Sequence, residues 1–418
     1  MNILLINHYA GSPQHGMEFR PYYLAREWVR AGHKVRILGA DFSHVRSHQP
    51  KRNFGAQATW CESIEGIDYQ WFATPKYKGN GVSRVRNIAT FLGRVFFASR
   101  QISDEFKLDV VIASSTYPMD IWLARRFAKL ANAKLIFEVH DLWPLSPIEI
   151  GGMSPSHPFI RLCQAAEDAA YRDADLVVSM LPNVAAHAAQ KGLPLERLVV
   201  VSNGVSLDDW EDKVPAPVRE DIRAAIDAAH AVGHLVVAYT GSHGLPNALD
   251  TLLDAAALLR NEELTFILVG DGHERLRLQA RCRVEGLINV QMFDPVPKAQ
   301  MVALLASVDM AYLGAPKHPI YRFGVSPNKM IDYMMARVPI LYAIEAGNDP
   351  VAEAGCGLAV LAEASIDLAK SIRELASLSP SARMAMGEKG RSYALAHHTY
   401  DVLAAKFIKA VEKIGLRK

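Results

Sequence analysis

The chain has 418 residues, with 46 lysines and arginines against 44 aspartates and glutamates and a formal net charge of +2. This balance gives no electrostatic basis for binding nucleic acid, and a hydrophobic content of 50% excludes a disordered protein. The length predicts two or three domains, each with its own core, and no apolar run reaches the roughly 18 residues of a membrane-spanning helix.

Short apolar strands alternate with helical patterns along the chain. The first set of strands is predicted at residues 2–7, 34–38, 109–113, 134–139, 175–180 and 198–202. The start of the chain is interpreted as a strand and not as a signal peptide, because it lacks a basic segment and a long apolar stretch. The second set is predicted at 234–240, 264–269, 288–292, 309–313, 338–342 and 357–361. Helices such as 19–31 and 249–260 lie between strands, and this alternation predicts an α/β fold of doubly wound parallel sheets.

Residues 206–217 are acidic, carry two prolines and predict a linker. We therefore expect two Rossmann-like domains, one at 1–205 and one at 218–400, whose strand ends face a shared ligand cleft. The four cysteines are scattered, without the Cys-x-x-Cys spacing of a zinc site, which predicts reduced thiols in a cytoplasmic protein.

The segment SPNKMIDYMMARVPIL predicts a capped helix followed by a buried strand. Ser326 is expected to be the N-cap, and Pro327 the first helical residue. Asn328 and Lys329 would then lie at the positive end of the helix, where an anion is favoured, with Asp332 on the same face. The alternative is a surface helix carrying a Lys–Asp pair and no ligand.

Glycine-rich loops follow several predicted strands. Gly16 lies in the first of them, which lacks the spacing of a dinucleotide-binding loop and could instead be a flexible surface loop. Gly241 and His243 follow one strand of the second domain, and Gly270 and Gly272 follow the next. Each glycine turn alone is weak evidence of a ligand site. Because both occur in the domain that carries the capped helix, together they predict a ligand site there.

His140 follows a strand of the first domain and precedes Asp141 and Trp143. A histidine at a strand end can bind a sugar hydroxyl or act as an acid or base near neutral pH. Alternatively, His140 could serve only as a hydrogen-bond partner for nearby backbone groups.

Taken in order, these features resemble those of a retaining nucleotide-sugar glycosyltransferase of family four, with the two-domain GT-B architecture. The features are the N-terminal glycine loop, Gly32-His33-Lys34-Val35, Glu138-Val139-His140-Asp141, Asn203-Gly204-Val205, Val269-Gly270-Asp271-Gly272 and the segment that starts at Ser326. The chain is most similar in kind to bacterial enzymes that add N-acetylated amino sugars or deoxy-amino sugars during O-antigen or capsule synthesis.

The resemblance implies roles for particular residues. Asp332 matches the family's second glutamate, which binds the nucleotide ribose, whereas Gly324 stands where the first glutamate contacts the donor sugar. The family's usual basic residues after the first strand of the second domain are missing, so Arg322 and Lys329 are candidates to hold the diphosphate without a metal.

Two roles fall in the first domain. His140 matches a histidine that contacts the donor sugar, and Gly16 matches a glycine near the distal phosphate and the acceptor. The final helix, 401–418, is expected to pack back on the N-terminal domain.

The activity implied is transfer of an N-acetylated amino sugar from a UDP-linked donor to a lipid-linked or saccharide acceptor, with retention and with no metal or other cofactor. Two alternatives stay open. One is a nucleotide-sugar 2-epimerase on the same fold, which needs no acceptor. The other is a catalytically silent sugar-nucleotide-binding partner, which the loss of the first glutamate at Gly324 would suit.

Residues 69–103 contain no acidic residue. Basic side chains (Lys76, Lys78, Arg84, Arg86, Arg94, Arg100) are interspersed with apolar ones at helical spacing (Val85, Ile88, Leu92, Val95, Phe96, Ile102). Over 76–102 this pattern predicts a helix on the anionic inner face of the cytoplasmic membrane. The alternative is a helix that faces the core and leaves its arginines in solvent.

Overall fold

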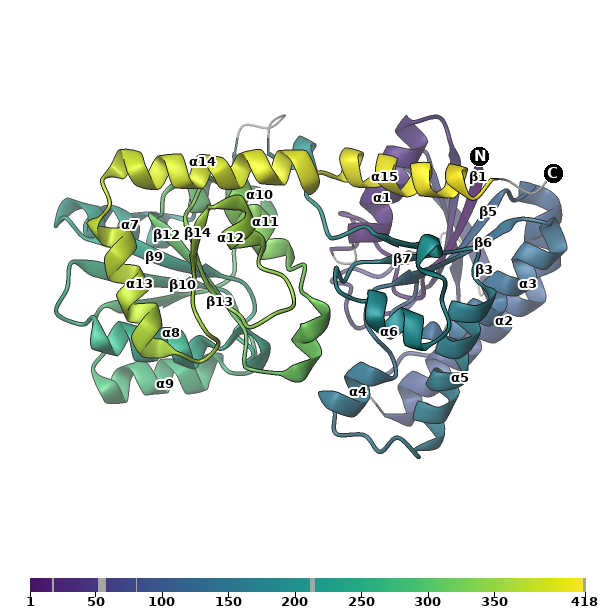
Figure 1. Ribbon diagram of the computed structural model, residues 1–418, viewed down its shortest axis with the longest axis horizontal. Coiled ribbons are helices and arrows are strands. Elements are labelled where there is room, and N and C mark those ends of the chain that lie inside the picture. Colours follow the sequence, from purple (N-terminus) through teal and green to yellow (C-terminus); the bar gives the residue numbers. More distant parts are fainter. Residues whose placement is uncertain (17–18, 52–57, 80, 211–214, 416–418) are drawn as a thin grey trace. The chain divides into compact units, whose positions relative to one another are not determined.

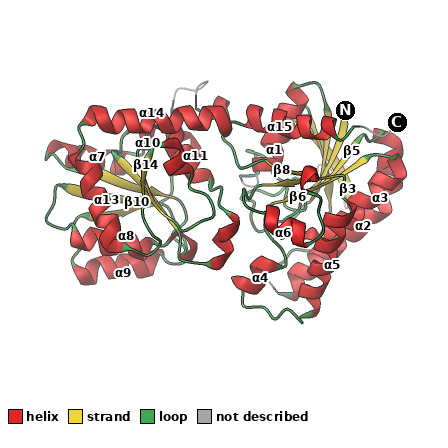
Figure 2. Ribbon diagram, viewed as in Figure 1, coloured by secondary structure: helices red, strands yellow, loops and turns green. Residues whose placement is uncertain are grey.

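The computed structural model describes residues 1–16, 19–51, 58–79, 81–210 and 215–415 and divides into two compact units. The first unit consists of Met1–Asn203 with Tyr400–Lys418, and the second of Gly204–Thr399. Each unit is an open sheet with helices on both faces (Figures 1 and 2). The predicted α/β class, with two Rossmann-like doubly wound domains, is confirmed.

Eight strands form the sheet of the first unit, in the order β3-β4-β2-β1-β5-β6-β7-β8. Neighbouring strands are parallel except at the edge, where β3 pairs antiparallel with β4. The strands are β1 (Asn2–Ile6), β2 (Lys34–Ala40), β3 (Thr59–Ile64), β4 (Ile67–Phe72), β5 (Val110–Ala113), β6 (Lys134–Val139), β7 (Leu176–Ser179) and β8 (Leu198–Val200). The central strands are buried along almost their whole length, as parallel strands covered on both faces require.

The helices of the first unit cover this sheet. They are α1 (Phe19–Arg30), α2 (Val82–Phe106), α3 (Ile121–Ala131), α4 (Leu145–Glu149), α5 (Pro158–Asp173), α6 (Ala185–Gln190) and α15 (Tyr400–Lys413). The last of them, α15, lies beside α1 (Figure 1), where Tyr400 stacks on Tyr23 with ring centroids 4.8 Å apart. Phe407 and Trp28 pack edge to face in the same contact. The end of the chain thus completes the core of the unit in which the chain begins.

Six parallel strands form the sheet of the second unit, in the order β11-β10-β9-β12-β13-β14. The strands are β9 (Leu235–Thr240), β10 (Leu264–Val269), β11 (Val290–Phe293), β12 (Met310–Gly314), β13 (Ile340–Ala343) and β14 (Gly357–Ala359). The helices are α7 (Glu220–Ala231), α8 (Leu249–Leu258), α9 (Arg275–Glu285), α10 (Lys298–Ala306), α11 (Asn328–Met335), α12 (Pro350–Ala354), α13 (Ser365–Ser377) and α14 (Pro380–His397). Separate apolar cores lie on the two faces of this sheet.

The twelve strands predicted from apolar runs are all present, with ends shifted by at most two residues. Two strands, β3 and β4, were not predicted. Polar residues alternate with apolar ones along both, because this edge of the sheet is only partly covered. A search for continuous apolar runs does not find such strands.

The predicted linker at 206–217 begins inside the second unit. Leu207–Asp209 forms a short 3₁₀ helix, and Leu207 and Trp210 pack against the core of the second unit. Residues 211–214 lie outside the described part of the chain.

Helix α2 carries apolar side chains on two faces, one of which is buried and the other exposed. Ile88, Phe91, Val95 and Ile102 are buried in the first unit, as the core-facing interpretation expects. On the other side, Phe97 and Val82 are each 85% exposed, and Val85 and Phe96 are also exposed. Within the described residues, no helix combines the length and the apolar character that crossing a bilayer requires.

Candidate active site

The carboxyl ends of β9 and β10 lie side by side, with Thr240 opposite Val269. The loops that follow are packed so closely that a side chain at Gly270 would place its Cβ 1.8 Å from the carbonyl oxygen of Gly241. A Cβ at Gly272 would lie 2.4 Å from the carbonyl oxygen of His243. These glycines allow the two loops to approach each other, so part of the glycine pattern has a structural cause.

Lys329, from the first turn of α11, reaches these loops. Its Nζ donates to Asn247 Oδ1 at 2.6 Å and to the Tyr239 hydroxyl at 3.0 Å, and it lies 4.6 Å from the centroid of the Tyr239 ring. It also lies against Gly241, where an added Cβ would be 3.2 Å from Nζ. Lys329 makes no ion pair with any residue that the structure describes, and burial lowers its pKa to about 8.

The Lys329–Asp332 ion pair of the alternative interpretation is therefore not formed among the described residues. Lys329 is directed to the loop after β9, the loop that lacks the basic residues expected there. A partly buried cation whose partners among the described residues are all neutral is favourable when an anion occupies the site, because the anion replaces the charge stabilisation that water would give.

His243 is the second unusual side chain at these loops. It is fully buried, and neither ring nitrogen has a hydrogen-bond partner among the described residues. Its pKa is lowered to about 4, chiefly by burial and also by the charges of Arg275 and Lys329, with an opposing effect of Asp271. The imidazole is therefore neutral at physiological pH, with a donor and an acceptor that are both unused.

The predicted N-cap at Ser326 is wrong by one residue. Helix α11 begins at Asn328, and Pro327 occupies the N-cap position with ψ of 132° and no side-chain cap. Pro327 itself has an extended backbone, so the helix cannot include it and starts one residue later than predicted. Asn348 holds the segment that leads into α11. Its side-chain amide accepts a hydrogen bond from the Val325 N–H at 2.8 Å and donates one to the Val325 carbonyl at 3.0 Å.

Asp332 lies one turn after Lys329 and is partly buried. Burial raises its pKa to about 6, with an opposing effect from Lys298 and a reinforcing one from Asp209. Lys298 and Asp209 form an ion pair of 2.6 Å. Asp332 is thus a carboxylate held in an environment that disfavours its charge, which is typical of a residue kept for binding.

The remaining predicted donor-site residues lie at the surface. Asn328 is exposed, and Ser326 is partly buried. Arg322 is exposed as well; it donates to the carbonyl of Pro319 at 2.6 Å and stacks on Phe323 at 4.3 Å.

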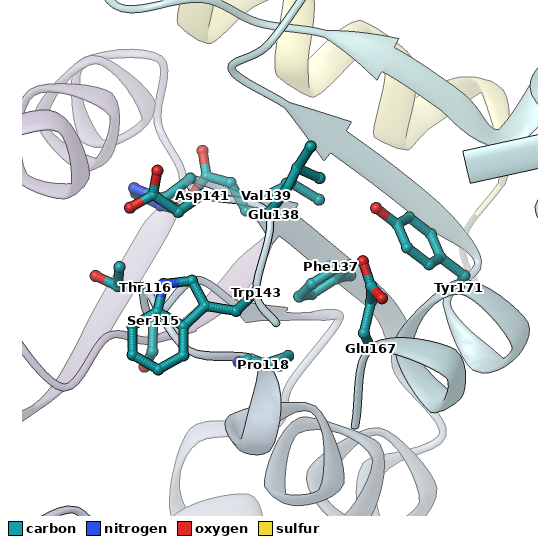
Figure 3. A pocket seen from close by; sticks show the side chains of 12 residues that line it. Ser115, Thr116, Pro118, Phe137, Glu138, Val139, Asp141, Trp143, Glu167 and Tyr171 are labelled. Carbon is teal, nitrogen blue, oxygen red and sulfur yellow. Dashed lines mark hydrogen bonds and ion pairs between the residues drawn. The ribbon is translucent and has the colours of Figure 1, made fainter. Parts of the chain in front are cut away.

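In the first unit, His140 lies just after β6 beside a buried acid. Its Nε2 is 3.2 Å from Glu138 Oε2 and 3.0 Å from Ser114 Oγ. The pocket next to it is formed by the ends of β5 and β6 and by α5; Figure 3 shows Thr116 and Trp143 on one side of this pocket and Glu167 and Tyr171 on the other.

Gly16 also lies in the first unit. Its φ of +85° favours glycine, and an added Cβ would lie 2.9 Å from Ser47 Oγ. Met17 and Glu18, the next two residues, lie outside the described part of the chain. Across the residues that the structure does describe, no group of three or more His, Cys, Asp or Glu side chains could hold a metal ion.

The structure adds residues that the sequence did not mark. Tyr239 and Asn247 contact Lys329, Arg275 lies near His243, and Glu138 contacts His140. Only Glu138 carried a sequence signal, as an acid inside an otherwise apolar strand. The others come together through contacts between residues far apart in the chain.

Two family models together match most of the chain: the Glycosyl transferase 4-like domain matches residues 15–204, and Glycosyl transferases group 1 matches residues 234–377. The putative colanic acid biosynthesis glycosyl transferase WcaI of Escherichia coli K12 is 25% identical over 68% of this chain and 69% of its own length. The probable glycosyltransferase WbjE of Pseudomonas aeruginosa is 24% identical over 83% of this chain and 85% of its own length. Among solved structures, HepE from Anabaena in complex with UDP-glucose superposes with a TM-score of 0.66 at 16% identity, over 99% of this chain and 100% of HepE.

Proposed function

Because the chain belongs to the glycosyltransferases with the GT-B fold, we propose that it moves a sugar from a nucleoside diphosphate donor to a lipid-linked or saccharide acceptor in cell-surface polysaccharide biosynthesis. The observation that carries this proposal is the partly buried Lys329, whose ammonium group is directed to the loop after β9. The carboxyl ends of parallel strands are where such sheets bind nucleotides.

The chemistry requires stabilisation of a departing diphosphate. As the bond between the anomeric carbon and the diphosphate lengthens, the sugar gains oxocarbenium character and negative charge grows on the leaving oxygen. Lys329 and the N-terminal end of α11 would stabilise this charge, with Arg322 as a further cation at the mouth of the site. Interactions that strengthen as this charge grows raise the rate of the chemical step.

We assign the other roles from the resemblance to family four. Asp332 would accept hydrogen bonds from the ribose hydroxyls, and His140 would contact a hydroxyl of the donor sugar. Gly324 stands where the family has a glutamate, so the backbone of residues 323–326 would supply that contact to the sugar. Retention, by attack on the face that the leaving group vacates, is what the resemblance to family four implies.

We propose UDP as the carrier and an N-acetylated amino sugar as the transferred group. The UDP assignment is supported by the fold shared with HepE, whose structure holds UDP-glucose. We further propose that the protein acts at the inner face of the cytoplasmic membrane, where α2 would meet the bilayer.

The experiment is a turnover assay with a panel of UDP-, GDP- and ADP-linked sugars, with and without a polyprenyl diphosphate-linked saccharide. We expect nucleotide release that depends on the acceptor, and NMR of the product showing the anomeric configuration of the donor. Acceptor-independent conversion of the sugar nucleotide would instead indicate an epimerase. Binding without any turnover would indicate a silent partner.

A further inference from the structure

Glu138 is a fully buried carboxylate in a strand that is otherwise mostly apolar. Its Oε1 accepts two hydrogen bonds from Arg20, from Nε at 3.1 Å and Nη2 at 2.9 Å. Its Oε2 accepts one from Ser114 Oγ at 2.6 Å and lies 3.2 Å from His140 Nε2. A buried charge is costly unless it is paired, so these partners explain how Glu138 is tolerated.

Arg20 is itself held in place. It lies in the first turn of α1 and also donates to the carbonyl oxygens of Val201 and Ser202. Burial alone would raise the pKa of Glu138, but the charge of Arg20 and the contact with His140 hold that pKa well below its usual range. Glu138 is therefore an anion, and it acts as an acceptor only.

The hydrogen-bond pattern determines where His140 carries its proton. Ser114 has one hydroxyl hydrogen, and the short contact directs it to Glu138 Oε2. At the 3.0 Å contact between Ser114 Oγ and His140 Nε2, the serine oxygen must then accept. If Nε2 were unprotonated, its lone pair would face the Glu138 carboxylate at 3.2 Å, and two acceptors would repel each other.

We infer that Glu138, held by Arg20, is a positioning residue that keeps neutral His140 in the Nε2–H form and so presents the Nδ1 lone pair as a hydrogen-bond acceptor. Glu138 is the second-last residue of β6 and His140 follows the strand directly, so the two side chains are only two residues apart and reach each other at 3.2 Å. Resting on the proposed function, the group that Nδ1 accepts from is a hydroxyl of the donor sugar. Glu138 would not touch the sugar.

The proton position can be measured without any substrate. In the full chain labelled with ¹⁵N-histidine at mildly alkaline pH, the His140 signals, assigned with His140→Gln, should show a protonated Nε2 and an unprotonated Nδ1. In Glu138→Gln the amide can donate to Nε2 as well as accept from it, so the two forms should mix. A parent protein with the proton on Nδ1, or the same single form in Glu138→Gln, would overturn the inference.

Two further variants separate positioning from stability. Asp309→Asn removes a His–carboxylate pair of the second unit, between His230 and Asp309 at 3.0 Å, and should leave the His140 signals unchanged. If Glu138→Gln does not fold, Glu138→Asp keeps the charge beside Arg20 but shortens the reach to His140, and should give the same mixing.

Kinetics then test the link to the reaction. Glu138→Gln should lower kcat/KM by about 10- to 100-fold, by analogy with the partners that orient metal-bound histidines. In a His140→Ala background the same substitution should change kcat/KM by less than about twofold, because both act through one group. Multiplying effects would show that Glu138 acts independently of His140. Absence of any transfer would count against the proposed function, while the NMR result would still decide the role of Glu138.

Discussion

Lys329 and Asn247, 82 residues apart in the chain, are joined by a hydrogen bond of 2.6 Å from the lysine Nζ to the amide oxygen. This contact brings a cation from α11 to the loop that follows β9. Residues 241–247 contain no arginine or lysine, so a helix from elsewhere in the unit supplies the charge.

The affinity for UDP should decrease as the pH rises through the pKa of Lys329. Burial has lowered that pKa to about 8, so Lys329 is charged below pH 8 and loses its charge above it. Bound diphosphate stabilises the charged form and should raise the pKa, so binding near pH 8 should take up protons. Calorimetry in buffers of different ionisation enthalpy measures this uptake. In Lys329→Met, the fall in affinity around pH 8 should disappear, and an unchanged profile in that variant would assign the titration to another group.

Replacing Asp332 should weaken nucleotide binding while sparing the fold. A hydrogen bond to a charged group is worth about 1.5–3 kcal/mol, so Asp332→Ala should weaken UDP binding by about 10- to 150-fold. Asp367→Ala, which removes an exposed carboxylate paired with Lys370 in the same unit, is the matched control. Equal dissociation constants for Asp332→Ala and the parent would remove Asp332 from the site.

The pH dependence of the stability of the fold gives an independent check on the role of Asp332. Because the pKa of Asp332 is raised to about 6, the folded protein binds a proton more tightly than the unfolded chain, and this carboxyl group makes the fold less stable as the pH rises from about 4 to 6. Asp332→Asn removes that loss and should melt at a higher temperature than the parent at neutral pH. A lower melting temperature would indicate that Asp332 serves the fold instead of a ligand.

Transfer should not require a divalent metal. In the proposed mechanism, Lys329 and the start of α11 would stabilise the leaving diphosphate, which is a task that a metal ion can also perform. Full activity in EDTA is the expected result. Loss of transfer in EDTA, with recovery on addition of Mg²⁺ or Mn²⁺, would contradict this assignment.

Helix α2 should bind anionic vesicles through its exposed side. Phe97 and Val82 are 85% exposed, and Arg86 and Arg100 lie exposed on the same helix. Cations near an anionic bilayer contribute about 1 kcal/mol each, an effect that salt weakens. Arg86→Gln with Arg100→Gln and Phe97→Ser should therefore reduce sedimentation with vesicles that contain phosphatidylglycerol and leave UDP binding unchanged.

Two other arginines of α2 make poor test positions. Arg84 donates to the Tyr9 hydroxyl at 2.8 Å, and Arg94 donates to the carbonyl of Ala58 at 3.1 Å. Substituting either would disturb contacts within the first unit. Vesicle binding that is equal in the triple variant and the parent would leave α2 as an ordinary surface helix.

The sequence predicted what depends on local pattern and missed what depends on long-range packing. Continuous apolar runs gave the central strands, whereas β3 and β4 were missed because their alternating polar residues face solvent. The importance of Lys329 could be predicted from its place in the helix, but its partners Tyr239 and Asn247 could not. The start of α11 was placed one residue early, with Ser326 as the N-cap, because a serine before proline resembles a cap whether or not it acts as one.

The measurement that tests the account most directly is a calorimetric comparison of UDP and uridine binding to the parent, to Lys329→Met and to Lys370→Met. Lys370 is an exposed lysine paired with Asp367 in the same unit and serves as the control. If Lys329 holds the diphosphate, Lys329→Met should bind UDP at least about 10-fold more weakly, the loss of a charge-assisted hydrogen bond, while its affinity for uridine stays the same. UDP binding that is equally tight in Lys329→Met and the parent would contradict the assignment of the diphosphate to this site.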